Sequence, residues 1–290
     1  MAYDHAPKPP EHDSQRDRLH GKQVAAMFGR IAGWYDFLNH SLSLGMDIYW
    51  RWRLARAARP RPTGGSGGTV LDLAAGTLDV ALALTRQYPS VRVAAVDFSL
   101  PMLQRGQGKL KGLEDRIFPI QGDGRALPLP DESVDAATIA FGIRNIRPRP
   151  EAHAEVLRVL RPGGRFCILE FGTAKRKVWG GLYNFYLDSV LPTLGKLISG
   201  DRSAYRYLAD TIRDFPDERT LARELLDAGY ARVFHVAMLS GIVYLHVAEK
   251  AGEPEAQQGP ETLGPEAATP ADATGVTESQ EDVLRCFTRE

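Results

Sequence analysis

Short apolar runs alternate with segments of helical periodicity through the first half of this chain. Each run is followed closely by a glycine or an acid, as expected where a buried strand ends in a turn. The segment between the first two runs, residues 78–88, has apolar side chains at spacings that predict an amphipathic helix. The runs lie at residues 69–73, 91–96, 117–121 and 134–141. Strands that alternate with helices predict a parallel sheet covered by helices.

The second half continues the pattern and then changes it. A fifth strand is predicted at residues 165–170 and a helix at residues 218–228. Two further strands, at residues 232–238 and 242–249, are joined by Leu239-Ser-Gly241, and so short a joint predicts an antiparallel hairpin. We therefore expect an α/β, Rossmann-like fold with a seven-stranded sheet, whose strand order the sequence does not give.

The remaining segments suggest a domain with additions. Residues 1–18 are polar, and residues 251–290 are rich in Pro, Gly, Ala, Thr and Glu, so we expect both to be disordered. Within the domain at residues 19–250, aromatic amphipathic segments over residues 19–59 predict two or three short helices that cap the fold. Residues 172–216 are too long for an ordinary connection and predict a helical lid.

Charge is distributed unevenly, although the formal net charge is zero. The acidic tail contains nine acidic and two basic residues, and totals of 36 and 36 then leave 27 acidic and 34 basic residues before it. A mildly basic body favours an anionic membrane face, where we expect transient contact, and we expect no nucleic-acid partner.

The cysteines and apolar stretches indicate a cellular location. Two cysteines, with no Cys/His cluster, fit a reducing cytoplasm and predict neither disulfides nor a metal site. The polar N-terminus does not resemble a signal peptide. The most apolar long stretch, residues 178–200, is interrupted by Asp188, Pro192 and Lys196, so we do not expect it to span a membrane.

Gly76 ends the first strand at a turn that is typical of nucleotide-binding units. The strand, the turn, the helix and a second strand that ends at Asp97 form the first half of a βαβ unit. A glycine lets the backbone approach a ligand closely. A carboxylate at a strand tip can accept hydrogen bonds from both ribose hydroxyls of an adenosine. The alternative for Asp97 is an ordinary strand-ending acid in solvent.

The composition of this turn indicates which nucleotide is bound. A dinucleotide site needs GxGxxG, whereas this turn has one glycine and leads into Asp79, which would repel phosphate. Asp79 would instead complement the helix dipole and a cationic or zwitterionic ligand. S-adenosylmethionine (SAM) fits because it has no phosphate. Asp72 is a second acid near the expected SAM ammonium group, unless it caps loop amides.

These features together predict a class I SAM-dependent methyltransferase. After the third strand, Asp123 and Gly124 stand where such folds often contact the adenine amino group, with a plain Asx turn as the alternative. The fourth strand leads to Arg144 and Asn145 at its C-terminal end, where open sheets bind ligands.

Several longer blocks resemble the ubiquinone/menaquinone biosynthesis C-methyltransferases, over residues 24–250. The narrowest of these signals are Phe141-Gly-Ile-Arg-Asn145 and Tyr205-Arg-Tyr-Leu208. Broader ones are Met27-Phe-Gly-Arg-Ile-Ala-Gly-Trp-Tyr-Asp-Phe-Leu-Asn39, Val70-Leu-Asp-Leu-Ala-Ala-Gly-Thr77, Leu129-Pro-Asp-Glu-Ser-Val-Asp135, Arg158-Val-Leu-Arg-Pro-Gly-Gly164 and Ser240-Gly-Ile-Val-Tyr-Leu-His246.

The resemblance implies SAM contacts at Thr77, Asp97 and the pair Asp123-Gly124. The chain departs from the family at three places. Leu78 stands where the family usually has Gly, Asp123-Gly124 where it has Asn-Ala, and Ala140 where some members have a SAM-binding Ser. The contact of that Ser cannot be carried over to this chain.

The reaction that the resemblance implies is methyl transfer to a ring carbon of a reduced prenylated quinone. That carbon becomes nucleophilic when a neighbouring hydroxyl ionises. We hypothesise that Arg144 stabilises the developing phenolate and that Asn145 orients it; the alternative for Arg144 is a surface ion pair. His153 and His246 are possible bases, but we expect core or surface roles for them.

The sequence leaves the acceptor open. Demethylmenaquinol is favoured as the broader bacterial case, with a methoxybenzoquinol of ubiquinone synthesis, or both, as the alternative. A methyltransferase for another lipid, an NAD-dependent oxidoreductase and a non-catalytic binding protein are further alternatives. An apolar substrate tail predicts a cytoplasmic protein that visits the inner face of the membrane. The arginines between residues 51 and 61, the cap and the lid are the candidate contacts.

Overall fold

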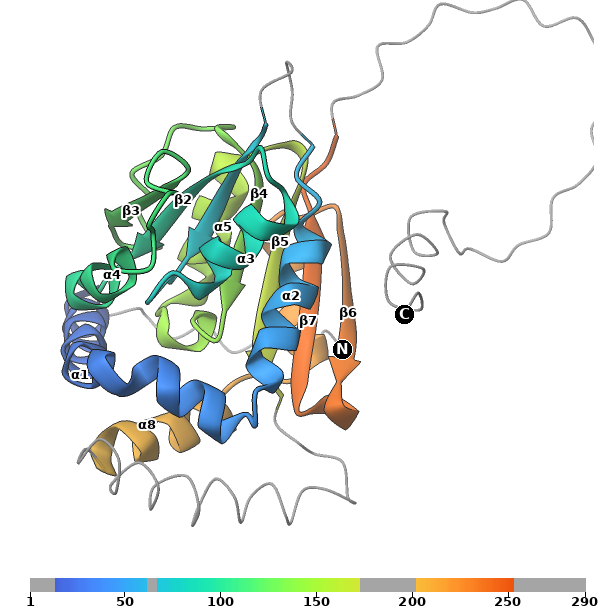
Figure 1. The fold of residues 1–290 in the computed structure, drawn as a ribbon. Helices are drawn as coiled ribbons and strands as arrows, with labels where there is room; N and C mark the ends of the chain where they lie inside the picture. Colours follow the sequence, from blue (N-terminus) through green and yellow to red (C-terminus); the bar gives the residue numbers. More distant parts are fainter. Residues whose placement is uncertain (1–13, 62–66, 173–201, 253–290) are drawn as a thin grey trace, which may run out of the picture. The chain divides into compact units, whose positions relative to one another are not determined.

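The computed structural model describes residues 14–61, 67–172 and 202–252 (Figure 1). Residues Met1–Ala251 form one unit and Gly252–Glu290 another. The start of the expected disordered N-terminus, residues 173–201 of the expected lid and nearly all of the acidic tail therefore lie outside the described residues. The expectations for these segments remain predictions.

The predicted seven-stranded sheet is present, with strand order β3-β2-β1-β4-β5-β7-β6. Strands β1 to β5 are parallel where they pair, and β7 runs antiparallel to both β5 and β6. The strands are β1 (Thr69–Leu73), β2 (Arg92–Asp97), β3 (Ile117–Gln121), β4 (Val134–Ala140), β5 (Leu160–Phe171), β6 (Arg232–Met238) and β7 (Val243–Glu249). This confirms the class I fold and adds the strand order, which no local pattern could supply.

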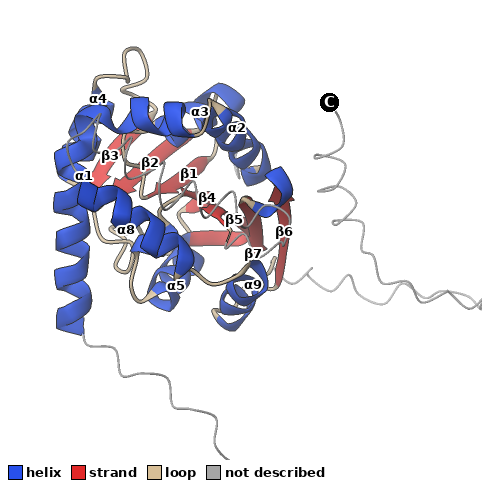
Figure 2. Ribbon diagram, turned by 90° about the horizontal axis from the view of Figure 1, so that it is seen from below, coloured by secondary structure: helices blue, strands red, loops and turns tan. Residues whose placement is uncertain are grey.

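Helices cover both faces of the sheet (Figure 2). On one face α2, α3 and α4 pack against the strands, and on the other α5 and α9 do so. These helices are α2 (Met46–Ala58), α3 (Asp79–Gln87), α4 (Leu100–Gln107), α5 (Arg149–Val159) and α9 (Glu218–Asp227). The apolar core under α5 and α9 includes Phe166, Ile168, Val156 and Leu225, which are all buried. This burial fixes which face of each strand meets which helix.

The N-terminal cap differs from the prediction. Instead of two or three short helices, α1 (Ser14–Leu42) is one long helix, followed by α2. It begins before the expected domain start at Leu19, so the predicted disordered segment of residues 1–18 is too long. Helix α1 packs on α4 at Gly29, where a Cβ would lie 3.4 Å from Pro101 Cγ.

Two short 3-10 turns and one further helix complete the described part. Turn η1 (Ile143–Asn145) follows β4, and η3 (Leu239–Gly241) forms the joint of the predicted hairpin. Helix α8 (Arg202–Arg213) lies within the expected lid and contacts η1. Among the described residues, no helix combines the length and the apolar character that crossing a membrane would require.

Candidate active site

A cavity opens at the C-terminal ends of β1, β2 and β4, where the strand order reverses on either side of β1. Open α/β sheets bind their ligands at this point. The cavity encloses about 850 Å³, including space open to solvent. Its lining from the sheet side includes Gly76, Asp97, Phe98, Ser99, Met102, Gly122, Asp123, Gly124, Ala140, Asn145 and Arg147.

Helix α1 forms the opposite wall of this cavity. It contributes Gly21, Val24, Ala25, Phe28 and Tyr35, a mostly apolar set. The Ser99 hydroxyl donates to the Ala25 carbonyl at 3.4 Å and so ties α1 to the start of α4. Ser99 is the N-cap residue of α4, but its side chain makes no cap hydrogen bond to that helix. The N-terminal helix is therefore part of the site as well as a cover for it.

Asp97 joins the two ligand-facing turns. Its Oδ2 accepts from the Gly76 N–H at 2.8 Å and its Oδ1 from the Ser99 N–H at 2.7 Å. Burial raises the pKa of this carboxyl, and the two N–H donors oppose the rise. Each carboxylate oxygen has lone pairs beyond these bonds, so Asp97 can still accept from two vicinal hydroxyls. The solvent-exposed alternative for Asp97 is therefore wrong.

The turn after β1 is built from backbone in the left-handed region. Gly76 has φ 53°, and the non-glycine residues Ala74 and Leu78 have φ 53° and 70°. A positive φ costs energy for residues with a Cβ. The family's usual glycine at the position of Leu78 would avoid that cost. The turn keeps its shape here because the Leu78 side chain is fully buried and packed.

Asp72 lies in the strand beneath this turn, outside the cavity lining. The Thr138 hydroxyl donates to its Oδ1 at 3.0 Å, while Oδ2 has no hydrogen-bond partner among the described residues. Burial raises the pKa of this carboxyl to about 7. Because Asp72 does not line the cavity, its expected contact with the SAM ammonium group stays a prediction. The residues that do line the cavity at the strand ends, with the Asp97 carboxylate and the open backbone of Gly76, fit SAM.

Thr77 and Asp79 bind protein groups rather than facing the cavity. The Thr77 hydroxyl donates to Asp36 of α1, and Lys109 Nζ lies 2.7 Å from Asp36 and 2.6 Å from Asp79. Arg51 Nη1 is 3.6 Å from Asp79. The structure does not support the expectation that Asp79 faces a cationic ligand, because Asp79 is absent from the cavity lining and pairs with Lys109 and Arg51. A direct SAM contact of Thr77 stays a prediction.

Asp123 and Gly124 line the cavity beside Asp97. Asp123 Oδ1 also accepts from the Arg125 N–H at 3.0 Å, so the Asx turn given as the alternative is present, and an adenine contact stays a prediction. Asp123 is paired with Arg125, whose Nη2 lies 2.7 Å from its Oδ2. The carboxylate stays 31% exposed in its side chain. It can therefore accept a hydrogen bond while the arginine balances its charge.

Arg144 and Asn145 are separated by the tertiary structure. Asn145 lines the cavity, but Arg144 does not. Arg144 is buried, with its Nη1 2.6 Å from both Glu170 Oε1 and the Phe141 carbonyl oxygen. Arg144 therefore forms an ion pair, as the alternative expected, but this pair is buried and does not lie at the surface. Burial raises the pKa of Glu170, and Arg144 opposes that rise.

Tyr207, to which the sequence pattern assigned no role, contacts Asn145 and is itself contacted by His20. The hydroxyl of Tyr207 on α8 donates to Asn145 Oδ1 at 3.1 Å, and Tyr207 Oη lies 3.5 Å from His20 Nε2 on α1. Tyr207 belongs to the block Tyr205-Arg-Tyr-Leu208, which the sequence singled out without a function. The histidines that it did weigh, His153 and His246, are buried, and burial lowers their pKa values to about 4. The expected core role is confirmed for both.

Comparison with known proteins agrees with this geometry. The model of the ubiE/COQ5 methyltransferase family matches residues 16–250. A protein of Syntrophotalea carbinolica named "Ubiquinone/menaquinone biosynthesis C-methyltransferase UbiE" is 43% identical over 231 residues, covering 80% of this chain and 95% of that protein. A Geobacter sulfurreducens protein of the same name is 40% identical over 233 residues, covering 79% and 89%.

A solved structure supports the fold independently. It is a SAM-dependent methyltransferase of Thermotoga maritima, described as a possible histamine N-methyltransferase, with a TM-score of 0.53 and 16% identity. It covers 78% of this chain and 99% of its own. Identity at this level supports the fold, while the family match and the relatives support the family. The chain belongs to the ubiE/COQ5 methyltransferase family and takes its methyl group from SAM.

Proposed function

We propose that this protein methylates a ring carbon of a reduced prenylated quinone, converting demethylmenaquinol to menaquinol. The observation that carries the proposal is one cavity that joins Gly76 and Asp97, on the SAM side, to Asn145 and the apolar wall of α1. The names of the relatives support the quinone as substrate class. The choice of menaquinol over a ubiquinone precursor is ours.

SAM supplies an electrophilic methyl group on a sulfonium. The protein must align the acceptor carbon with that methyl and favour ionisation of the neighbouring hydroxyl. Asn145 lines the cavity and is suited to hold that oxygen. We assign Arg144 an electrostatic role from beneath the cavity, where its charge would favour the phenolate. Its field reaches this region, because Arg144 lowers the pKa of Tyr207 against the rise caused by burial.

Labelled SAM with two short-chain acceptors, a demethylnaphthoquinol and a methoxybenzoquinol, tests the substrate. Label in the naphthoquinol alone supports menaquinone synthesis, and label in both indicates a shared enzyme. Label in the benzoquinol alone would replace our choice by ubiquinone synthesis. A third assay with phosphatidylethanolamine tests the alternative of another lipid. If SAM binds but no quinol is labelled, the proposed substrate is wrong.

The role of Arg144 requires a variant that does not unfold the site. Arg144→Ala would leave Glu170 buried and unpaired, which typically costs about 3–5 kcal/mol. Arg144→Lys keeps a charge for Glu170. We expect kcat to fall more in Arg144→Met, which loses the charge, than in Arg144→Lys, while the Kd of SAM changes little in both. A kcat equal to that of the wild type in a folded Arg144→Met protein would remove Arg144 from the mechanism.

We also propose transient contact with the inner face of the cell membrane, by a cytoplasmic protein. Exposed apolar side chains gather where α1 meets α2: Leu44 is 91% exposed and Trp52 40%. The guanidinium groups of Arg53 and Arg56 lie over the rings of Tyr49 and Trp52, at 5.5 Å and 4.8 Å from their centroids. Aromatic and basic side chains on one helix are suited to an anionic headgroup region.

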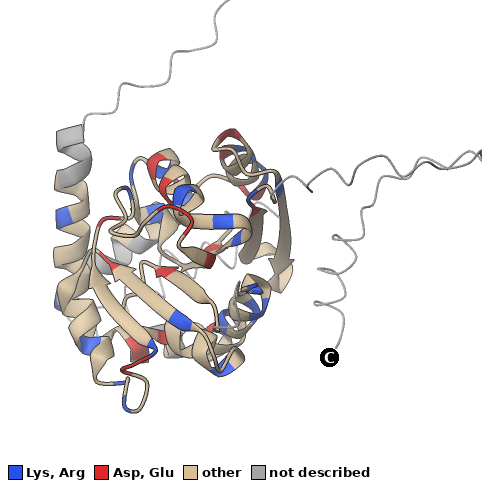
Figure 3. Ribbon diagram, turned by 90° about the horizontal axis from the view of Figure 1, so that it is seen from above, with Lys and Arg blue, Asp and Glu red and all other residues tan. Residues whose placement is uncertain are grey.

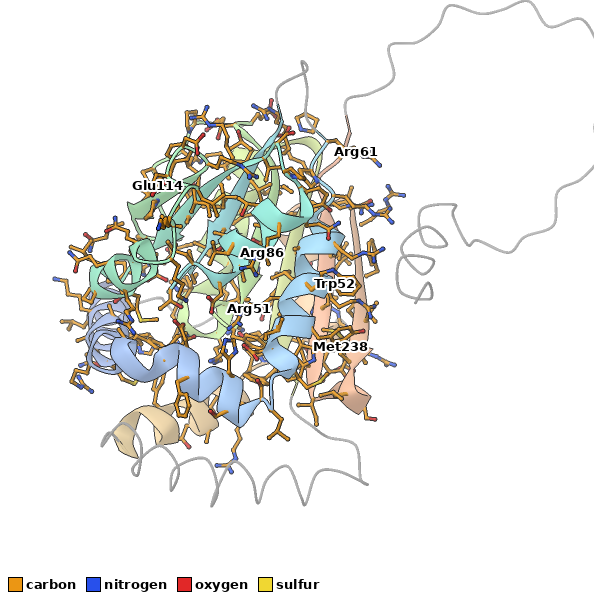
Figure 4. All side chains as sticks on the ribbon, viewed as in Figure 1. Arg51, Trp52, Arg61, Arg86, Glu114 and Met238 are labelled. Carbon is orange, nitrogen blue, oxygen red and sulfur yellow. The ribbon has the colours of Figure 1, made fainter. Side chains whose placement is uncertain are left out.

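The side chains of α2 divide between this surface and the interior. Figure 4 shows Trp52 on the outward side of α2, whereas Arg51 lies toward the interior and is 8% exposed. Basic and acidic positions are both spread over the described elements (Figure 3), and Arg51, Arg53 and Arg56 follow one another along α2. Arg51 therefore serves the ion cluster with Asp79, and the arginines after it are the candidates for lipid contact.

A further inference from the structure

We propose that Tyr207 is a positioning residue that fixes the amide of Asn145, so that its Nδ2 group donates to the ionised oxygen of the acceptor. The inference rests on the proposed function and names how the site recognises the reactive oxygen. Tyr207 itself does not appear in the cavity lining, whereas Asn145 does. It would therefore act through its neighbour.

The contact joins three parts of the chain that are far apart in sequence. Tyr207 lies on α8, Asn145 in η1 and His20 on α1. The Tyr207 hydroxyl donates to Asn145 Oδ1 at 3.1 Å, and its oxygen lies 3.5 Å from His20 Nε2. A hydroxyl can donate once and accept at the same time. A histidine N–H at this distance would leave the Tyr207 proton directed at Asn145.

An asparagine amide has one accepting and one donating end. With Oδ1 occupied by the Tyr207 hydroxyl, the donating end is left to the cavity. Asn145 Nδ2 has no hydrogen-bond partner within the part of the chain that the structure describes. Burial raises the pKa of Tyr207, so its hydroxyl keeps the proton that it donates. When His20 Nε2 carries the imidazole hydrogen, the amide cannot turn without leaving the tyrosine proton unpaired.

The direction of this donor matters for the chemistry. A donor favours the ionised form of an oxygen, and an acceptor favours the protonated form. Methyl transfer to the ring carbon needs the ionised form, because the phenolate supplies electron density to the ring. An Asn145 amide turned the other way would accept from the hydroxyl and hold its proton in place. Tyr207 would thus decide whether Asn145 assists ionisation or opposes it.

A double-mutant cycle of Tyr207→Phe and Asn145→Ala tests the inference. Loss of one preorganised donor typically lowers kcat by about 10² or more, which we expect for Asn145→Ala. We expect a smaller loss, about tenfold, for Tyr207→Phe, because the amide then populates both orientations. In the Asn145→Ala background, Tyr207→Phe should cause almost no further loss, since the residue through which it acts is absent. The Kd of SAM should stay unchanged in all variants.

The control is Tyr88→Phe. Tyr88 is also partly buried, and its hydroxyl donates to the Arg56 carbonyl at 3.3 Å outside the cavity lining. A general loss of stability would affect both phenylalanine variants, and thermal unfolding would reveal it. Losses of kcat that multiply in the double variant, or an unchanged kcat in Tyr207→Phe, would overturn the inference.

A second readout does not depend on turnover. A chromophoric naphthol bound in the cavity should have its own pKa lowered in the wild type, and lowered less in Tyr207→Phe and Asn145→Ala. Equal naphthol pKa values in wild type and Tyr207→Phe would overturn the inference. A wild type that binds SAM but methylates no quinol would instead overturn the proposed function, and the naphthol titration would still test Tyr207.

Discussion

Leu78 and Gly106 are complementary in shape: the buried leucine side chain occupies the space that a Cβ on the glycine would fill. A Cβ built on Gly106 would lie 2.6 Å from Leu78 Cγ, and also 2.8 Å from the Thr77 carbonyl carbon. Leu78 is completely buried. The family's usual glycine at the position of Leu78 is thus replaced by a side chain that packs against another glycine, on α4. The SAM-binding turn keeps its path because of this pair.

Gly106→Ala should lower the free energy of unfolding, because its Cβ would meet both a side chain and backbone. We expect a loss of about 1–3 kcal/mol, typical of overpacking. Gly108→Ala is the matched control, since its Cβ would be in ordinary contact with the Arg105 carbonyl oxygen, at 3.7 Å. Chemical denaturation of both variants provides the comparison. Equal stabilities would contradict the packing of Leu78 on Gly106.

At Leu78 we expect the glycine variant to be at least as stable as the alanine variant, which reverses the usual order in a helix. Leu78→Ala creates a cavity and should cost about 2–5 kcal/mol, while retaining a residue at φ 70°. Leu78→Gly has the same loss of packing but relieves the strain, so we expect it to be at least as stable. At Leu84, which is buried within α3, glycine should be less stable than alanine by about 1 kcal/mol. If glycine were less stable than alanine at both positions, the proposed backbone strain at Leu78 would be contradicted.

Asp72 should make stability depend on pH between about 4 and 7. Its pKa is raised from 3.8 to about 7 by burial. When folding raises the pKa of an acid, its stabilising contribution is complete at pH values below the pKa of the unfolded state. The contribution is lost as the pH rises through the pKa of the folded state. Each unit of pKa shift corresponds to about 1.4 kcal/mol.

We therefore expect the stability of the wild type to fall relative to that of Asp72→Asn as the pH rises through this window. Above the window, the two curves of stability against pH should be parallel. Urea unfolding without added SAM, at a series of pH values, measures the difference. Thr138→Val should raise the pKa of Asp72 further, because it removes a hydrogen bond that lowers it. Parallel curves for wild type and Asp72→Asn across the whole window would show that Asp72 does not titrate there.

Lys109→Met should loosen α1 from the turn before α3. Lys109 Nζ lies 2.7 Å from Asp36 and 2.6 Å from Asp79. Its removal takes away a positive charge that both carboxylates contact. We expect a loss of about 1–2 kcal/mol, which salt would reduce. We also expect weaker SAM binding, because α1 forms a wall of the cavity. Lys111→Met removes the same charge from an exposed site nearby and should have little effect on either measurement.

Membrane contact through α2 predicts a specific charge dependence. Replacing Arg53, Arg56 and Arg59 with glutamine should reduce retention on vesicles that contain anionic lipid, by about 1 kcal/mol for each residue near the surface. The control variant has glutamine at Arg86, Arg219 and Arg223, which removes the same charge from α3 and α9. Equal retention of the wild type on neutral and anionic vesicles would contradict the contact.

Arg144 and Asn145 have different surroundings, which the sequence did not predict. Arg144 and Asn145 are adjacent in the chain and were predicted to act together. In the fold Asn145 faces the cavity and Arg144 pairs with Glu170 on β5. Neighbouring residues in a tight turn point in different directions, and only the position of β5 decides which of them has a partner. Tyr207 and His20 could not be placed for the same reason, since long-range packing brings Tyr207 to Asn145 and His20 to Tyr207.

The sequence by itself determined the elements and the edge at which they bind a ligand. Apolar periodicity gave the strands and helices, because each element must bury one face. Gly76, Asp97 and the pair Asp123-Gly124 were assigned to the cavity because strand ends of a parallel sheet lie at one edge. The tertiary structure decided the strand order, the role of α1 as a wall, and the pairing of Leu78 with Gly106. These depend on contacts between distant segments, and no local pattern encodes such contacts.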